Sequence, residues 1–162
     1  MSFLENLSLA NITLTNASDV DVRGGGEGNI SIDARNLTLE AGEFGRSFIR
    51  GGISSESTDL EAQAGDAILN VAENISLNDS GIANQAAPNA VGNSGNIIIN
   101  TGSLELVNGS QVDASTFGSG DAGAVNVTAT GDITADGEDS DGFTSGITSL
   151  VDTGAEGNAG GG

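Results

Sequence analysis

The stretch that decides the fold is residues 92–123, which read GNSGNIIINTGSLELVNGSQVDASTFGSGDAG. Ile97 and Ile99 alternate with other residues in its first half, and Leu104 and Leu106 alternate in the same way after a short turn. A period of two is typical of a strand buried on one face, whereas a helix would space apolar residues three and four apart. The stretch therefore predicts short strands joined by tight turns.

The same pattern recurs along the whole chain. A glycine stands two residues before an alternating run at Gly28, Gly65, Gly95 and Gly123, and the pattern begins again at Gly160, with intervals of 28 to 37 residues. The positions expected to face inward are Ile30, Ile32, Ala34, Ala67, Leu69, Val71, Ile97, Ile99, Thr101, Val125, Val127 and Ala129 in first strands, Leu37, Leu39, Ile75, Leu77, Leu104, Leu106, Ile133 and Ala135 in second strands, and Ile53, Ile82, Val112 and Ile147 in third strands. An incomplete copy at the N-terminus contributes Leu7, Leu9, Ile12, Leu14, Val20 and Val22.

Such a strand triplet cannot bury its apolar face alone, so we expect repeats to stack at about 4.8 Å, with Ile on Ile and Leu on Leu. The prediction is an all-β fold, a right-handed parallel β-helix (solenoid) of about five triangular coils of three short strands. The hand is the usual one for parallel crossovers. The chain is then a single β-helix segment, residues 1–162, and a fragment of a longer shaft. Its coils are expected at approximately 1–27, 28–64, 65–94, 95–122 and 123–159.

Corner residues agree with this fold. Short polar side chains that stack at a corner can hydrogen-bond along the column, and the position before each second strand holds Asn11, Asn36, Asn74, Ser103 and Asp132. The glycines before the first strands suit a corner that needs a positive φ. Repeat length varies mainly between second and third strands, where residues 40–52 and 136–146 predict long loops that could carry specificity.

The composition excludes several classes of function. The 162 residues include no His and no Cys, which removes imidazole bases, thiolate nucleophiles, ordinary zinc sites and disulfides. A net charge of −19 with four Arg opposes binding to nucleic acid and to anionic membranes. No apolar run approaches the roughly 20 residues that span a bilayer, so no membrane insertion is expected. The first residues lack signal-peptide features, so an export signal is expected outside this chain.

The stretch 92–123 resembles one repeat of filamentous-haemagglutinin-like exoproteins, most closely the Gly- and Asn-rich repeats of cyanobacterial members. The resemblance covers nearly all of the chain and starts again at residues 157–160. In that family such repeats form long right-handed β-helical shafts of surface adhesins or released exoproteins, which are exported by two-partner secretion. The family's N-terminal secretion domain is not in this sequence. The resemblance therefore implies a shaft segment of a secreted or cell-surface protein.

One loop is the candidate for ligand binding. Residues 40–52 contain Phe44, Arg46, Phe48 and Arg50, which are two of the five Phe and two of the four Arg. Aromatic and Arg side chains are enriched where proteins bind partners, so these four are expected to contact a glycan or a cell-surface ligand. In the alternative interpretation, the Phe side chains fold back over the flank of the fold and the Arg pair with nearby Glu.

An acidic cluster is the candidate for Ca²⁺ binding. It consists of Asp132, Asp136, Glu138, Asp139 and Asp141. Its spacing fits neither an EF-hand nor the Gly-rich nonapeptide repeat, and a solvated acidic loop is the favoured interpretation. We therefore expect no metal and no cofactor.

The predicted function is that of a structural and adhesive shaft segment that presents its loops for surface or glycan contact, without enzymatic activity. Open β-edges at its two ends favour end-to-end self-association. The alternative is a polysaccharide-binding or polysaccharide-cleaving β-helix of the pectate-lyase or tailspike type. Glycoside hydrolysis needs two carboxylates, and nothing in the sequence selects such a pair.

Overall fold

The computed structural model describes residues 8–59 and 61–160, and within them the chain forms eleven strands and no helix. The strands are β1 (Ile12–Thr15), β2 (Asp19–Asp21), β3 (Ile30–Glu40), β4 (Phe48–Ile53), β5 (Ala67–Asn78), β6 (Gly81–Ala86), β7 (Ile97–Val107), β8 (Gln111–Asp113), β9 (Val125–Ala129), β10 (Ile133–Asp136) and β11 (Gly146–Thr148). Among these residues there is accordingly no helix that could cross a membrane. The predicted all-β class is confirmed.

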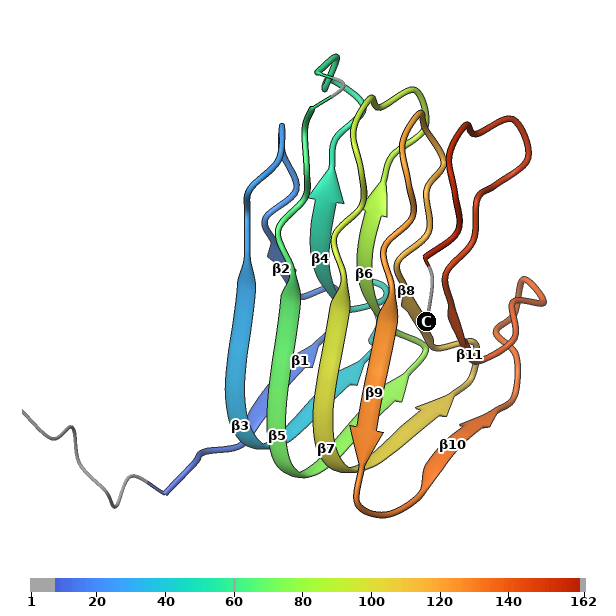
Figure 1. The fold of residues 1–162 in the computed structure, drawn as a ribbon. Helices are drawn as coiled ribbons and strands as arrows, with labels where there is room; N and C mark the ends of the chain where they lie inside the picture. The colour runs from blue at the N-terminus through green and yellow to red at the C-terminus, as the bar shows by residue number, and fades with distance from the viewer. Residues whose placement is uncertain (1–7, 60, 161–162) are drawn as a thin grey trace, which may run out of the picture.

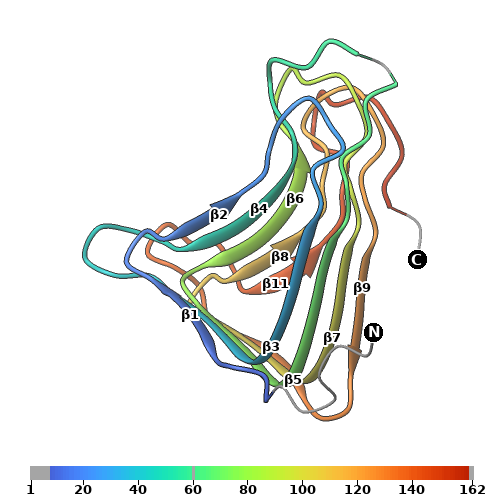
Figure 2. The ribbon, with the colours of Figure 1, turned by 90° about the vertical axis from the view of Figure 1, so that its left-hand side faces the viewer.

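The strands form two parallel sheets (Figure 1). The first sheet has the order β1-β3-β5-β7-β10, with β9 also paired to β7, and the second has the order β11-β8-β6-β4-β2. Every strand pair is parallel and joins one repeat to the next. Figure 2 looks along the stack and shows the strands of each sheet lying one behind another around the core. The chain thus passes from the first sheet to the second once in every repeat.

The first and second strands predicted for each repeat join into one long strand in the inner repeats. The pairing between β3 and β5 shifts register between Ala34 and Asn36, and a similar shift occurs between β5 and β7. In the last repeat the two parts are the separate strands β9 and β10, which pair with the two ends of β7. The register shifts, and the break between β9 and β10, therefore lie where the sequence predicts a corner.

Like residues stack in columns because the register matches equivalent positions in successive repeats. The column in the first sheet consists of Ile12, Leu37, Ile75, Leu104 and Ile133. The column in the second sheet consists of Val20, Ile49, Ile82, Val112 and Ile147. The middle members of both columns are fully buried in the main core cluster.

The third strand of the second repeat begins earlier than the sequence pattern predicts. Its residue in the apolar column is Ile49 rather than Ile53, because β4 begins at Phe48 and continues through a pair of glycines. Ile53 lies instead in a second, smaller cluster made mostly of Ala side chains. The loop predicted over 40–52 therefore shrinks to residues 41–47.

The recurring glycine is required by close packing and not by its φ angle. A Cβ at Gly95, Gly123 or Gly160 would lie 2.0 to 2.1 Å from the carbonyl oxygen of the equivalent glycine in the preceding repeat. A positive φ, which the sequence pattern predicts at these positions, occurs instead three residues earlier, for example 128° at Gly92. The prediction of the φ angle was wrong, although the need for glycine was right.

Polar side chains link the repeats at the corners. Asn36 Nδ2 donates to Asn11 Oδ1 at 3.1 Å, and Asn36 Oδ1 accepts from Asn74 N at 3.1 Å. Ser103 Oγ donates to Asn74 Oδ1 at 2.8 Å, which confirms the predicted ladder over four repeats. Asp132, the predicted fifth member, takes part through its backbone carbonyl, which accepts from an N–H group of β7. In a second ladder, the side-chain oxygen of one repeat accepts from the backbone N–H of the next. The acceptor and donor pairs are Asn29 and Asp66, Asp66 and Asn96, and Asn96 and Ala124.

Candidate binding site

Three of the four predicted binding residues lie together, and the fourth lies apart. Phe48 and Arg50 belong to strand β4 and face outward, because they alternate with the buried Ile49. Arg46 lies just before this strand, and all three residues line one pocket. Phe44 lies in the turn of the preceding loop, is 76% exposed and is not a lining residue of that pocket.

The pocket is a trough of about 240 Å³ on the outer face of the second sheet. The register of β4, β6 and β8 aligns one outward column of Phe48, Gly81 and Gln111. The next outward column consists of Arg50, Ala83 and Asp113. Because β6 contributes only small residues to these columns, it forms a low floor between walls made by β4 and β8.

The Phe48 ring leans over this floor. A Cβ at Gly81 would lie 3.0 and 3.1 Å from two ring carbons of Phe48, so glycine leaves room for the ring that a larger residue would take. The guanidinium carbon of Arg50 lies 3.9 Å from the ring centroid and that of Arg46 lies 5.4 Å from it. Both distances are within the range of cation–π attraction. The ring therefore helps to fix two Arg side chains along one wall.

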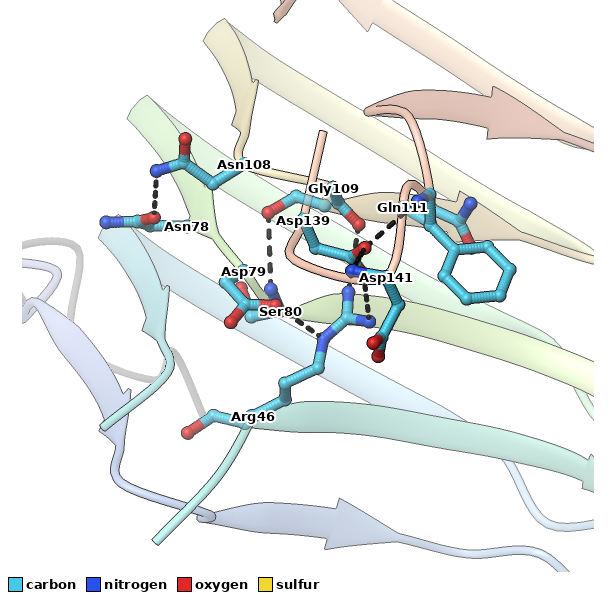
Figure 3. Close-up of polar contacts among 12 residues, drawn as sticks. Arg46, Asn78, Asp79, Ser80, Asn108, Gly109, Gln111, Asp139 and Asp141 are labelled. Atoms are coloured by element: carbon cyan, nitrogen blue, oxygen red, sulfur yellow. Dashed lines mark hydrogen bonds and ion pairs between the residues drawn. The ribbon is translucent and has the colours of Figure 1, made fainter. Parts of the chain in front are cut away.

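Arg46 closes one end of the trough and is held by partners from three other repeats (Figure 3). Its Nε lies 2.9 Å from Asp79 Oδ1, and its Nη2 donates to the Gly109 carbonyl oxygen at 2.9 Å. Its Nη1 lies 3.3 Å from Asp139 Oδ2. These partners belong to the third, fourth and fifth repeats. One side chain thus ties the second repeat to the fifth, and we call this set of contacts the Arg46 clasp.

The long loop of the fifth repeat, residues 137–145, folds back over the loop of the fourth repeat. A Cβ at Gly109 would lie 2.6 Å from Asp139 Cβ, so the two loops are in close contact. The Asp139 side chain is 8% exposed, and its Oδ1 accepts from the N–H groups of Asp141 and Phe143, each at 2.9 Å. The two loops that the sequence predicts to be long between second and third strands therefore meet on one flank, which sequence spacing alone does not predict.

Each Arg at the pocket faces an aspartate. Arg23 Nη2 lies 2.5 Å from Asp21 Oδ2, and Arg50 Nη1 lies 3.7 Å from Asp19 Oδ2. The hydrogen bond from Arg23 lowers the pKa of Asp21 to about 2, and the same contact raises the pKa of the Arg23 guanidinium. The Arg side chains are therefore paired, as in the alternative interpretation, but with Asp instead of Glu. The positive charge of the pocket is compensated locally.

The wall formed by β8 carries a buried carboxylate. Asp113 is 8% exposed, and its Oδ1 accepts from the N–H and the hydroxyl of Ser115. Its Oδ2 accepts from Gln85 Nε2 at 2.5 Å. Gln85 and Gln111 also line the trough, and both are half-buried. Amide, guanidinium and carboxylate groups thus surround one small space.

Sequence reasoning did not identify four polar residues that line the pocket, namely Arg23, Gln85, Gln111 and Asp113. They come from three different repeats and become neighbours only through the register of the sheet. The sequence nevertheless contains a signal for this arrangement. Aligning the repeats on Ile49 instead of on Ile53 places Phe48 and Arg50 opposite the third-strand residues of the next two repeats.

The acidic cluster does not gather into a metal site. Within residues 8–59 and 61–160, no group of three or more acidic side chains lies close enough together to hold a metal ion. Four members of the cluster are exposed: Asp132, Asp136, Glu138 and Asp141. The fifth, Asp139, takes part in the Arg46 clasp. This placement agrees with a solvated acidic loop.

Comparisons of the chain with protein-family models, with curated proteins and with solved structures find no match. The function is therefore proposed from the residues, the register and the pocket described above.

Proposed function

We propose that the chain is a segment of a right-handed parallel β-helix and acts as a structural and adhesive shaft of a secreted or cell-surface exoprotein of the filamentous-haemagglutinin-like kind. The observation that carries this proposal is the in-register parallel pairing of successive repeats in both sheets. A fold of this kind grows by adding repeats whose strands pair only with those of neighbouring repeats, so core size does not limit its length. The proposed hand is the usual one for parallel crossovers.

Variation in repeat length supports a presenting role. The repeats differ by up to nine residues, at 28 against 37, and the columns stay in register. Part of this difference in length lies in the loops 41–47 and 137–145, which are outside the stacked strands and meet on one flank. Loops held by a rigid scaffold are where binding residues tend to lie. The exposed Phe44 at the tip of the first loop suits contact with a surface.

The edges of the sheets support end-to-end association. Within residues 8–59 and 61–160, strands β9, β10 and β11 are paired on one side only, and their repeat exposes Ile133, Ile147 and Leu150 to 40–48%. An unpaired edge with apolar residues attracts another strand of the same alternation. We propose that a second copy can extend the stack, against the repulsion of a net charge of −19.

The trough favours one form of the alternative function, which is polysaccharide binding. Among the described residues that line it, Asp113 is the one carboxylate, whereas glycoside hydrolysis uses a pair. Binding by the outer face of the second sheet is compatible with a shaft, because the face remains available however many repeats follow.

Insertion of whole repeats tests the shaft. Two further copies of residues 65–94, placed after residue 94, would add two complete repeats between equivalent glycines. A β-helix should then lengthen by about 10 Å at constant cross-section. Small-angle X-ray scattering measures both quantities, as the maximum dimension and the cross-sectional radius of gyration.

The matched control inserts half a repeat, residues 80–94, which cannot complete a stack and should lower the free energy of unfolding. If the cross-section of the whole-repeat variant grows, or if its unfolding is no longer cooperative, the β-helical shaft is the wrong proposal.

A further inference from the structure

We propose that the trough on the second sheet binds one neutral sugar residue of a glycan. The proposal deepens the shaft function, on which it rests, by naming a ligand class and a site for the surface contact. The proposed site is therefore not the loop tip, where Phe44 lies, but the face of the second sheet, where strands of three repeats line the trough.

The shape of the trough fits a small ligand. Its volume of about 240 Å³ lies below the range of roughly 300–1,000 Å³ that is usual for pockets of drug-sized molecules. Its floor is Gly81 and Ala83, so the depth exists because β6 carries no large outward side chain at these positions. A space of this size suits a single sugar ring.

The polar groups of the trough fit a ligand that both donates and accepts hydrogen bonds. Arg23 and Arg50 carry donors only, whereas both oxygens of the buried Asp113 already accept from Ser115 and Gln85. The Gln85 side-chain oxygen is left as an acceptor, and the Gln111 amide offers both a donor and an acceptor. The hydroxyl groups of a sugar can satisfy this mixed set, because each hydroxyl is both a donor and an acceptor.

The charge of the trough favours a neutral ligand over an anionic one. Arg23, Arg46 and Arg50 each face at least one Asp carboxylate within 4 Å. The chain as a whole carries a net charge of −19, which repels an anionic polysaccharide at long range. An acidic sugar would have to displace an existing ion pair, whereas a neutral sugar would not.

Apolar surface completes the site. The Phe48 ring at one wall and the Ala83 methyl group on the floor lie beside the polar groups. Sugars present C–H groups on the faces of the ring and hydroxyl groups around its edge, so a site for them needs both kinds of surface. The trough combines an aromatic residue with planar polar side chains, which is the composition expected of such a site.

Nuclear magnetic resonance titration of the ¹⁵N-labelled chain tests the proposal. The neutral probes are maltotetraose, cellotetraose, mannotetraose and tetra-N-acetylchitotetraose, and the charged probe is tetragalacturonate. At least one neutral probe is expected to shift the side-chain amide signals of Gln85 and Gln111 together with the backbone signal of Ala83. Tetragalacturonate is expected to leave these signals unchanged.

Two substitutions locate the binding. Ala83→Leu fills the floor of the trough and should weaken binding at least tenfold, while Ala72→Leu makes the same change at an exposed corner of the same repeat and should leave affinity unchanged. Gln111→Ala removes polar groups without filling the space and should weaken binding by about tenfold. The proposal is overturned if no neutral probe shifts the trough signals, if Ala83→Leu binds as well as the parent chain, or if tetragalacturonate binds there more tightly.

The two experiments can fail separately, because the titration uses the parent chain and the repeat insertion uses a different variant. Insertion after residue 94 separates β8 from β6, so sugar binding is not measured on that variant. If the insertion variant lengthens as expected but the parent chain binds no neutral sugar, the shaft is kept and the sugar site is lost. If the parent chain binds sugar in the trough but the insertion variant does not lengthen, the site is kept and the shaft is lost.

Discussion

The fourth and fifth repeats share one residue pattern but not one environment. Leu104 and Ile133 are register partners in the same column, yet Leu104 is 1% exposed and Ile133 is 48% exposed. Val112 and Ile147 are also register partners, and they are 0% and 40% exposed. In the part of the chain that the structure describes, the fourth repeat is paired on both sides and the fifth on one side only. Burial of a side chain in this fold therefore depends on the next repeat more than on its own.

The contrast also implies unequal local stability. Apolar side chains stabilise a fold roughly in proportion to the area they remove from water, so the half-covered fifth repeat gains less than the fourth. Segments with few buried apolar contacts open at lower free energy than the rest of a structure. We expect the fifth repeat to open first.

The largest effect is expected from two matched substitutions in one column. Leu104→Asp introduces a charge at a fully buried position and should lower the free energy of unfolding by at least about 4 kcal/mol. Ile133→Asp introduces the same charge at a half-exposed position and should cost about 1 kcal/mol. Urea unfolding followed by circular dichroism measures both losses. Equal losses would remove the distinction between inner and end repeats.

Loss of the Arg46 clasp should loosen the fifth repeat while the fourth stays closed. Arg46→Ala leaves the nearly buried Asp139 without its cation and should cost about 1–2 kcal/mol. Chymotrypsin cleavage after Phe143, which lies in the same loop, should become faster and is followed by mass spectrometry. Arg35→Ala, at an exposed position outside the clasp, is the control and should leave the rate unchanged. An unaltered rate in the Arg46 variant would mean that the clasp does not hold the loop.

The exposed edge of the fifth repeat should govern self-association. In about 1 M NaCl, where charges are screened beyond about 3 Å, the chain should form larger species that sedimentation velocity detects. Ile147→Lys places a charge in the open column of the second sheet and should weaken this association about tenfold. A parent chain that stays monomeric at every salt concentration would show that the edge is protected.

The smallest effect is expected at the other end of the stack, in β2. Asp21 has a pKa of about 2 in the fold, below its ordinary value of 3.8, because Arg23 donates hydrogen bonds to it. The folded state therefore favours the carboxylate. Its contribution to stability is complete above about pH 4 and is lost as the pH falls toward 2. Because the pair is partly exposed, the contribution should stay below about 1 kcal/mol.

Urea unfolding between pH 5 and about pH 2 measures this contribution as the difference between the parent chain and Asp21→Asn. The difference should shrink as the pH falls. If it is constant over this range, the ion pair does not stabilise the fold.

The strands of the inner repeats were predictable because alternation marks a strand without reference to its neighbours. Leu69 and Ile99, for example, are both fully buried, as their positions in the pattern predict. The third strand of the second repeat was harder, since Gly51 and Gly52 read as a loop. Gly52 is nevertheless part of β4, where a Cβ would lie 1.9 Å from the Gln85 carbonyl oxygen. The glycine there reflects contact with the next repeat, which local sequence does not reveal.

The candidate site was predictable only in part for the same reason. Composition alone selected Phe48 and Arg50, because aromatic and Arg residues are rare in this chain. Their partners Gln111 and Asp113 lie two repeats away, and only the register of three strands makes them neighbours. Phe44, which composition selected equally, lies outside the trough because the chain turns before β4 begins.

The Arg46 clasp also bears on errors of assembly during folding. In a stack of similar repeats, a strand that pairs one whole repeat out of place still meets Ile with Ile and Asn with Asn, so the columns alone do not forbid it. The clasp distinguishes the repeats, since Arg46 reaches Asp79, Gly109 and Asp139 together only when the third and fourth repeats both lie in their proper places. We therefore expect the contacts between the two loops to favour correct pairing of the repeats over pairing that is shifted by one repeat.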